Sequence, residues 1–271
     1  VKERTADLNA KKEELEEQKK DIEDSIRYAK RIQNAILPPM ADVKSLFPNS
    51  FIYYQSKDIV SGDFYWVGEV ENKKLMAIVD CTGHGVPGAF MSIIGNNQLT
   101  QTVGIDKTFL PSKILNDVNS GVTALLRQTK GNTEVKDGMD LALISIDYEA
   151  LELNFAGAYN PVYIIRDKEL IEIKANKFPI GGFLNQDLEQ FQNNTFQLKK
   201  EDMIYMFSDG YMDQFGGPKG KKFKSRNMKN LMIEISELTC EEQHKILKNT
   251  INDWMVNEEQ VDDILVSGIK I

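Results

Sequence analysis

Apolar residues follow a helical period in the first part of the chain. From residue 1 to about 37 an apolar residue recurs at every seventh position, and several acidic residues stand four places before a basic one. The apolar positions are Val1, Leu8, Leu15, Ile22, Ala29 and Ile36. Because Lys11 and Gln18 occupy the second seam position, the pattern predicts either a weak coiled coil or a solvated helix packed on its own domain. Pro38 and Pro39 end this helix.

After residue 38 the period changes, and short apolar runs typical of strands alternate with a few helical stretches. The expected strands are 51–54, 74–79, 141–146, 151–155, 162–165, 170–173, 203–207 and 264–269. Helices are expected after Pro87 and Pro111 and near 229–238 and 240–256. A loop is expected between the first two strands. Alternation within the strands predicts an α/β (α+β) fold in which antiparallel sheets are covered by helices.

Composition and charge narrow the class of protein. The 271 residues are 41% apolar, enough for a core, and the net charge of −8 argues against nucleic acid or an anionic membrane as a partner. Cys81 and Cys240 are the only cysteines, so a reducing, cytoplasmic compartment fits. No apolar run reaches transmembrane length. The chain opens on Val1 within a helical pattern, so we expect a fragment, with residues 1–37 as a helical linker and residues 38–271 as the globular domain.

Four acidic motifs stand at the ends of the apolar runs. They are Asp58-Ile59-Val60-Ser61-Gly62-Asp63, Asp80-Cys81-Thr82-Gly83-His84-Gly85, Ser208-Asp209-Gly210 and Asp262-Asp263. A carboxylate at the end of a buried strand loses hydration, and a cation would offset that loss. One such residue alone, for example Asp80, is more often a turn residue that caps the backbone. Four in this order suggest that distant strands bring carboxylates to one or two hard cations, and magnesium and manganese prefer such oxygen ligands.

In order and spacing these motifs resemble the PPM-type metal-dependent serine/threonine phosphatases, specifically their bacterial SpoIIE-like branch. The resemblance covers the chain from about Ala35 to the C-terminus. It implies two stacked antiparallel β-sheets flanked by helices, with two manganese or magnesium ions as cofactors. The metal ligands that it implies are Asp63, Asp80 as the bridging residue, the carbonyl oxygen of Cys81, Asp209 and Asp262. By the same resemblance Asp263 supports Asp262, and Asp213 has a supporting or capping role.

The resemblance also implies an activity. A water that bridges the two metal ions would hydrolyse phosphoserine or phosphothreonine on a bacterial regulatory protein, such as a phosphorylated anti-sigma-factor antagonist, without a covalent enzyme intermediate. An upstream sensor would act through the N-terminal helix, for which we expect a parallel homodimer through Ile22, Ile26, Ala29 and Ile36. The alternative is a signalling module that has lost catalysis, although all the expected carboxylates are present.

Lys221 and Lys222 belong to a basic, Gly-rich segment of an otherwise acidic chain. This segment is either an ordinary solvated loop or a docking site for the phosphoprotein. Charge reversal at both residues would separate the two interpretations.

His84 follows Asp80 by four residues, whereas the general-acid His proposed in related phosphatases follows by two. We therefore expect a structural His in a Gly turn. Cys81 with His84, and Cys240 with His244, also have the spacing of a zinc set. The second pair falls in a charged helical stretch, so a zinc-stabilised interaction domain is only the third hypothesis.

Overall fold

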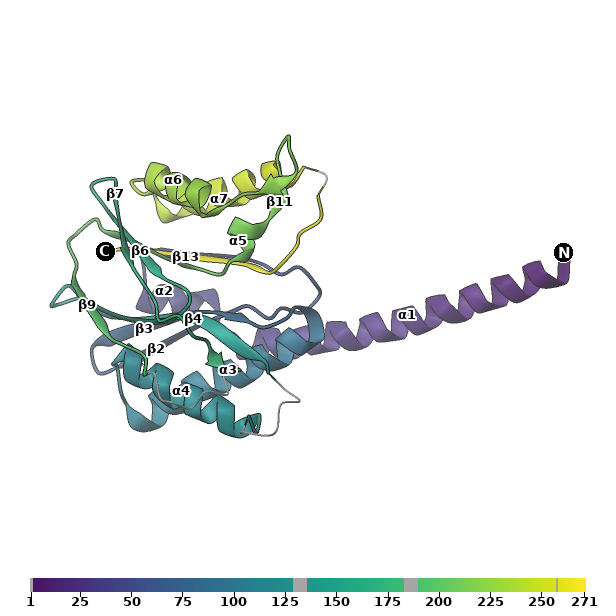
Figure 1. Cartoon of the computed structure of the whole chain (residues 1–271), viewed down its shortest axis with the longest axis horizontal. Helices are drawn as coiled ribbons and strands as arrows, with labels where there is room; N and C mark the ends of the chain where they lie inside the picture. Colours follow the sequence, from purple (N-terminus) through teal and green to yellow (C-terminus); the bar gives the residue numbers. More distant parts are fainter. Residues whose placement is uncertain (1, 129–135, 183–189, 257) are drawn as a thin grey trace.

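The computed structural model describes residues 2–128, 136–182, 190–256 and 258–271. Two antiparallel sheets stack face to face, helices cover both outer faces, and one long helix projects from the body (Figure 1). The sheet nearer the C-terminal helices, called sheet A, has the strand order β1 (Ser50–Gln55), β13 (Ile264–Lys270), β10 (Met203–Phe207), β6 (Val162–Arg166) and β7 (Glu169–Ile173). The other, sheet B, has the order β2 (Phe64–Val70), β3 (Lys73–Cys81), β4 (Gly138–Asp147), β5 (Glu152–Ala158) and β9 (Asn194–Gln197), and β8 (Ile180–Gly181) pairs with β4.

Each sheet has its own pair of covering helices. Sheet B packs against α3 (Gly85–Asp106) and α4 (Pro111–Leu125), and sheet A against α6 (Ser225–Ile235) and α7 (Cys240–Met255). The short helices α2 (Met40–Leu46) and α5 (Gly210–Asp213) and the hairpin β11 (Phe215–Gly216) with β12 (Lys221–Lys222) complete the described elements. The order of layers is therefore helices, sheet, sheet, helices.

Strands of sheet B are apolar on both faces because both faces are covered. Along β3, Ala77 and Val79 pack toward α3 and α4, whereas Met76 and Ile78 pack in the core between the sheets. Alternate residues of a strand point to opposite faces, so this division assigns a face to every residue of β3. It also explains why the strand reads in the sequence as a continuous apolar run.

The expected fold class is confirmed, and most expected elements are present with ends shifted by a few residues. The prediction of a loop up to residue 74 is wrong for Phe64–Val70, which forms β2. This strand pairs with β3, and a two-residue turn connects the two. Its aromatic and β-branched residues pack on one face beneath α3 and α4 and on the other face in the core between the sheets. The helix expected at 229–238 is α6, which begins earlier, at Ser225.

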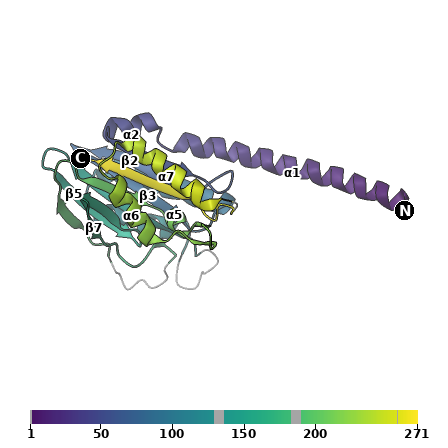
Figure 2. The same ribbon diagram turned by 90° about the horizontal axis from the view of Figure 1, so that it is seen from above.

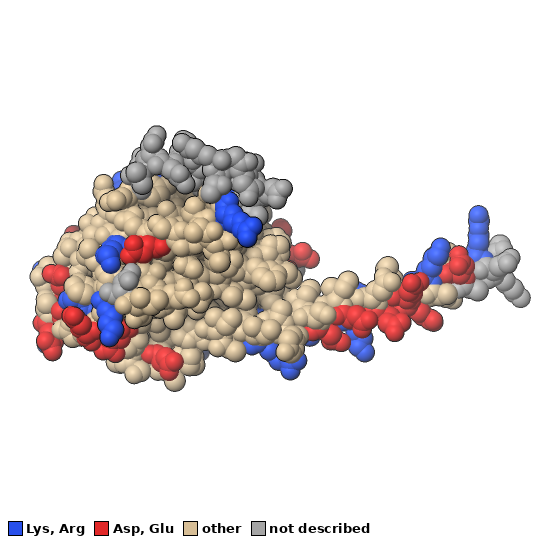
Figure 3. Space-filling view, turned by 90° about the horizontal axis from the view of Figure 1, so that it is seen from below, with Lys and Arg blue, Asp and Glu red and all other residues tan. Residues whose placement is uncertain are grey.

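The N-terminal helix α1 (Lys2–Ile36) extends well beyond the body (Figures 1 and 2). Leu8, Leu15 and Ile22 are 69%, 68% and 61% exposed, so the first three described positions of its apolar seam face solvent. Figure 3 shows charged side chains dense along α1 and sparse over the face of α3 and α4. None of the described helices combines the length and the apolar content needed to cross a membrane.

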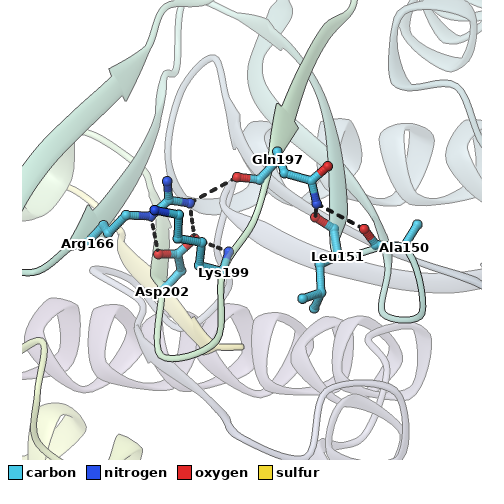
Figure 4. A network of polar contacts seen from close by, with 6 residues as sticks. All are labelled: Ala150, Leu151, Arg166, Gln197, Lys199 and Asp202. Atoms are coloured by element: carbon cyan, nitrogen blue, oxygen red, sulfur yellow. Dashed lines mark hydrogen bonds and ion pairs between the residues drawn. The ribbon is translucent and has the colours of Figure 1, made fainter.

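A polar network joins the two sheets at one end of the sandwich (Figure 4). The Arg166 guanidinium at the end of β6 makes two hydrogen bonds to the Asp202 carboxylate, of 2.8 and 2.6 Å, and a third of 2.9 Å to the carbonyl of Gln197 on β9. The Gln197 amide in turn donates to the carbonyls of Ala150 and Leu151. Because Asp202 is 1% exposed, its charge depends on Arg166 and on the backbone N–H of Lys199 for compensation.

Replacing Arg166 by Ala should destabilise the protein by about 2 to 3 kcal/mol, because it leaves a buried carboxylate without its cation while the partly exposed guanidinium limits the loss. Urea unfolding would measure the change. Lys168→Ala, which removes an ion pair between two exposed side chains with Glu237, is the control and should shift stability far less. Equal shifts for the two variants would show that the Asp202 network does not hold the sheets together.

Candidate metal centre

Acidic residues from both sheets meet at one end of the sandwich. Asp63 precedes β2, Asp80 lies at the end of β3 and Asp140 near the start of β4, while Asp209 and Asp263 adjoin β10 and β13. Along β2, β3 and β4 the residues that share the parity of these Asp residues pack in the inter-sheet core. The first three carboxylates therefore face the space between the sheets.

Asp63 is the most deeply buried of the residues predicted as ligands. Its side chain is 3% exposed, and its Oδ2 atom has no hydrogen-bond partner among the described residues. Burial, and then the charge of Asp80, raise the pKa of Asp63 well above its usual range. The main chain is held in place, because the Tyr54 hydroxyl donates to the Asp63 carbonyl at 3.0 Å.

Asp80 and Asp209 connect the two sheets at this end. The backbone N–H of Asp209, just after β10, donates to Oδ2 of Asp80 at 3.4 Å. Burial, followed by the nearby charge of Asp209, raises the pKa of Asp80 well above its usual range. Asp209 is at the open edge of the site, where solvent screens its charge, and burial and the Asp262 carboxylate raise its pKa to about 6.

Asp262 and Asp263 have different surroundings, as expected for adjacent residues that face opposite ways. The Asp263 carboxylate is 2% exposed and accepts hydrogen bonds from the backbone N–H groups of Lys57 and Gly62, at 2.7 and 2.8 Å. Asp262 is only half-buried, and one of its oxygens accepts from the N–H of Asp263. Asp263 thus fixes the loop before Asp63, and Asp262 keeps an oxygen available.

The backbone around Cys81 packs tightly against the loop before Asp63. A Cβ atom at Gly62 would lie 2.6 Å from the Gly83 carbonyl oxygen and 3.3 Å from the Cys81 carbonyl oxygen, so only Gly fits there. The Cys81 thiol points the other way, into the core beneath α3 and α4. Only the carbonyl of Cys81 therefore lies on the side of the carboxylates.

Asp140 belongs to the same group, and the sequence analysis missed it. It is paired in register with Asp80 across β3 and β4. Burial and the nearby Asp209 raise its pKa to about 6. The sequence analysis missed it because it is the third residue of β4 rather than part of a Gly-rich turn, although an Asp beside a long apolar run is a usable signal.

These groups fit a hard divalent cation by their chemistry. All the donors are carboxylate or carbonyl oxygens, one buried oxygen of Asp63 has no partner, and no Lys, Arg or His of the described residues forms an ion pair with the carboxylates. As they stand, however, no three His, Cys, Asp or Glu side chains in the described part of the chain are grouped closely enough to hold an ion. Binding would have to draw these side chains together.

Comparison with known proteins identifies the family. The family model described as "Stage II sporulation protein E (SpoIIE)" matches residues 71–271. The chain belongs to the SpoIIE family. The match includes Asp80, Asp140, Asp209 and Asp262, whereas Asp63 lies upstream of it. The predicted resemblance is therefore confirmed.

Individual relatives of this SpoIIE-family chain agree with the fold. The phosphoserine phosphatase RsbU of Bacillus subtilis (strain 168) is 26% identical over 196 residues, which are 70% of this chain and 54% of RsbU, so the chain spans about half the length of that relative. The structure of the SiaA-PP2C domain of Pseudomonas aeruginosa is 28% identical, with a TM-score of 0.85 over 94% of this chain and 98% of that one. SpoIIE from Bacillus subtilis, in a structure of its PP2C phosphatase domain with a fragment of its regulatory domain, is 23% identical, with a TM-score of 0.65 over 82% of this chain and 63% of that one, and it shares the fold.

Two residues of the SpoIIE-family chain that the sequence analysis treated separately contact each other. His84 Nδ1 lies 2.7 Å from Oδ2 of Asp58, and both side chains are about half exposed. Asp58 and His84 therefore form one polar pair at the surface of the Gly turn. Cys81 and His244 are far apart in the layers, since His244 stacks edge-on against Phe51 and Tyr53 on the outer face of sheet A. The two Cys-His pairs thus do not form one zinc set.

Asp213 and the basic segment lie next to the SpoIIE-family carboxylates rather than among them. Lys222 on β12 pairs with Asp213 at 2.6 Å, with both side chains partly exposed. Asp213 contributes to the raised pKa of Asp209 through its charge. Lys221 is exposed on the same hairpin, and its role in docking stays a prediction.

The metal-free protein should lose stability as the pH rises from about 4 through about 6. The pKa values of Asp63, Asp80 and Asp140 are raised in the folded state, so in this interval the folded protein keeps protons that the unfolded chain releases. Stability present below the unfolded pKa is therefore lost as the pH passes the folded pKa. Urea unfolding across this interval, with a chelator or with manganese, would measure the effect, and manganese should restore stability near pH 7. A chelated protein whose stability increases over the same interval would contradict the described electrostatics.

Proposed function

We propose that this chain is the catalytic part of a cytoplasmic protein phosphatase that hydrolyses phosphoserine or phosphothreonine on a bacterial regulatory protein. The observation that carries the proposal is the meeting of carboxylates from both sheets in a SpoIIE-family chain. Within the described residues none of them forms an ion pair, and one buried oxygen of Asp63 has no partner. The relative RsbU is named a phosphoserine phosphatase. A phosphorylated anti-sigma-factor antagonist is the kind of substrate we propose.

In this proposal two manganese or magnesium ions are held by Asp63, Asp80, Asp209, Asp262 and the carbonyl oxygen of Cys81. When bound, such ions neutralise the phosphoryl charge and lower the pKa of coordinated water. The backbone of the chain holds these ligands in position. The Asp263 carboxylate anchors Gly62, the hydrogen bond from Asp209 to Asp80 spans the sheets, and the close packing at Gly62 sets the Cys81 carbonyl.

Asp80→Asn and Asp209→Asn should each reduce manganese-dependent phosphate release to below about a hundredth of the wild-type rate, because each removes a proposed ligand charge. Both a phosphoserine protein and a small aryl phosphate should be affected. The matched control is Asp167→Asn, in the exposed turn between β6 and β7, which should have little effect. Retained turnover in either ligand variant would reject the assignment, and a wild-type chain inactive with every divalent ion would favour the inactive signalling module.

Substrate docking on the hairpin of β11 and β12 belongs to the same proposal. Lys222 is occupied by Asp213, which leaves the exposed Lys221 to meet an acidic partner. A hollow of about 660 Å³ lined by Pro218, Phe223 and Trp254, among others, lies beside this hairpin and could receive an apolar side chain. Lys221→Glu should raise the KM for a phosphoprotein, less so at high salt, and spare an aryl phosphate. Equal effects on both substrates would place the defect in the metal centre.

Control through the N-terminal helix is supported by a buried contact. Gln33, 2% exposed, donates from its amide to the Ser61 carbonyl at 2.6 Å and to the Ser92 hydroxyl of α3 at 3.0 Å, and its carbonyl accepts from the Ser61 N–H at 3.2 Å. Ser61 lies two residues before Asp63. A helix that rotated would remove two hydrogen bonds from the loop before Asp63 and a third from α3.

Gln33→Ala should lower manganese affinity and turnover together by about tenfold or more, because the backbone of Ser61 loses its partners. Isothermal titration and phosphatase kinetics would measure both. Asn34→Ala, at the next and exposed position of α1, is the control. If Gln33→Ala behaved like the control, α1 would be a passive linker.

Pairing of α1 with a second copy stays part of the proposal but changes its residues. Ile26, Ala29 and Ile36 are half-buried on the same face as Gln33, so they belong to packing on the helix's own domain. The exposed Leu8, Leu15 and Ile22 are the positions left for a parallel dimer. Sedimentation of wild type against a variant with Asp at Leu15 and Ile22 would decide, since a monomeric wild type at high concentration excludes the dimer.

A further inference from the structure

Asp140 has surroundings that require an explanation. Asp80 and Asp140 stand directly opposite each other on adjacent antiparallel strands, where like charges destabilise the pair. Within the described residues the Asp140 carboxylate has no hydrogen-bond or ion-pair partner, and the charges that act on it come from other carboxylates. A half-buried Asp in this position repels its neighbours and contributes nothing to packing.

The position of Asp140 beside Asp80 is fixed by the backbone. Just past the paired residues, the Thr82 N–H and hydroxyl both donate to the Gly138 carbonyl, each at 3.0 Å, and the Gly138 N–H lies 3.1 Å from the same hydroxyl. These contacts prevent β3 and β4 from slipping or separating at their ends. A Cβ at Gly138 would also lie 2.6 Å from the Ile180 carbonyl on β8, so the start of β4 is enclosed on its other side.

A divalent cation between Asp80 and Asp209 would lie within the influence of Asp140. The Asp209 N–H already reaches Oδ2 of Asp80, and Asp140 interacts electrostatically with both of these residues. The nearby Asp63 independently has a buried oxygen without a partner, which indicates that this group of carboxylates is arranged for a ligand rather than for solvent. Carboxylate oxygens at strand ends are typical donors to magnesium and manganese.

We propose that Asp140 is a further direct ligand of the metal ion held between Asp80 and Asp209, so that this ion has carboxylates from β3, β4 and the end of β10. The inference rests on the proposed metal-dependent function but adds a residue outside the ligand set expected from the acidic motifs. Two consequences follow. Removal of the Asp140 charge lowers the affinity for that ion and leaves the affinity for the other unchanged. A softer donor atom at position 140 changes which metal the site prefers.

The first measurement is manganese titration of the whole chain by calorimetry. Wild type should bind two ions, and Asp140→Asn should weaken one of them by about tenfold or more while leaving the other unchanged. The control is Asp147→Asn, at the far end of β4, where Asp147 pairs with Lys73 instead of with carboxylates. The metal-free Asp140→Asn protein should also unfold at a higher temperature than metal-free wild type, which shows that the variant is folded.

The second measurement separates direct ligation from an effect of charge at a distance. Asp140→Cys should bind cadmium with an ultraviolet sulfur-to-metal charge-transfer band, because a thiolate in the coordination sphere is a soft donor. Wild type and Asp147→Cys are the controls, because both keep the partly buried Cys240 thiol and the Cys81 thiol that points into the core. The band of Asp140→Cys should remain after the spectrum of either control is subtracted.

Weakened manganese binding in Asp140→Asn without a cadmium band in Asp140→Cys would overturn direct ligation. Unchanged manganese binding in Asp140→Asn would overturn any metal role for Asp140. A wild-type chain that binds manganese but hydrolyses no phosphoester would reject the proposed function while leaving the ligand assignment intact, and a wild-type chain that binds no divalent ion would reject both.

Discussion

Repulsion between carboxylates is the constraint around which this end of the molecule is built. Asp80 and Asp140 lie on β3 and β4, and Asp63 and Asp209 adjoin β2 and β10. Strand pairing and a hydrogen bond from the Asp209 backbone, rather than attraction between side chains, bring them near one another. Hydrophobic burial in three layers holds the sheets in register strongly enough to impose this proximity. The fold therefore stores unfavourable electrostatic energy at one edge, and a bound cation is the simplest way to release it.

The two ends of the sandwich use opposite solutions to the same problem. At one end Asp202 is buried with its own guanidinium, so its charge is compensated within the chain. At the other end the acids have one another and the backbone amides of Lys57, Gly62 and Asp209. The charge of Asp202 is therefore balanced within the chain, whereas the charge of the carboxylates at the other end depends on the ions that the solution provides.

The sequence predicted the parts of this site that have local signatures. Asp80 and Asp209 each stand between a buried strand and a Gly, which is visible without a structure. Asp140 has no such local signature. It joins the site because it pairs with Asp80, 60 positions earlier, and the register of two strands cannot be predicted from either segment alone. Gln33 was hidden for a similar reason, since within a heptad pattern a buried Gln reads as an interruption. β2 was missed because its two apolar faces show no alternation.

The shape of α1 determines what kind of motion it can transmit. Its 35 residues span about 52 Å, and it packs on the body mainly from Ile26 onward, so roughly two thirds of it acts as a free rod. A sideways displacement of the tip of a rod supported near its base becomes a much smaller displacement at Gln33, and bending absorbs part of it. Torsion about the rod's own axis is not reduced by length. A torque applied at the tip of α1 passes along its axis to Gln33, which contacts Ser61, so this geometry transmits torque better than lateral displacement.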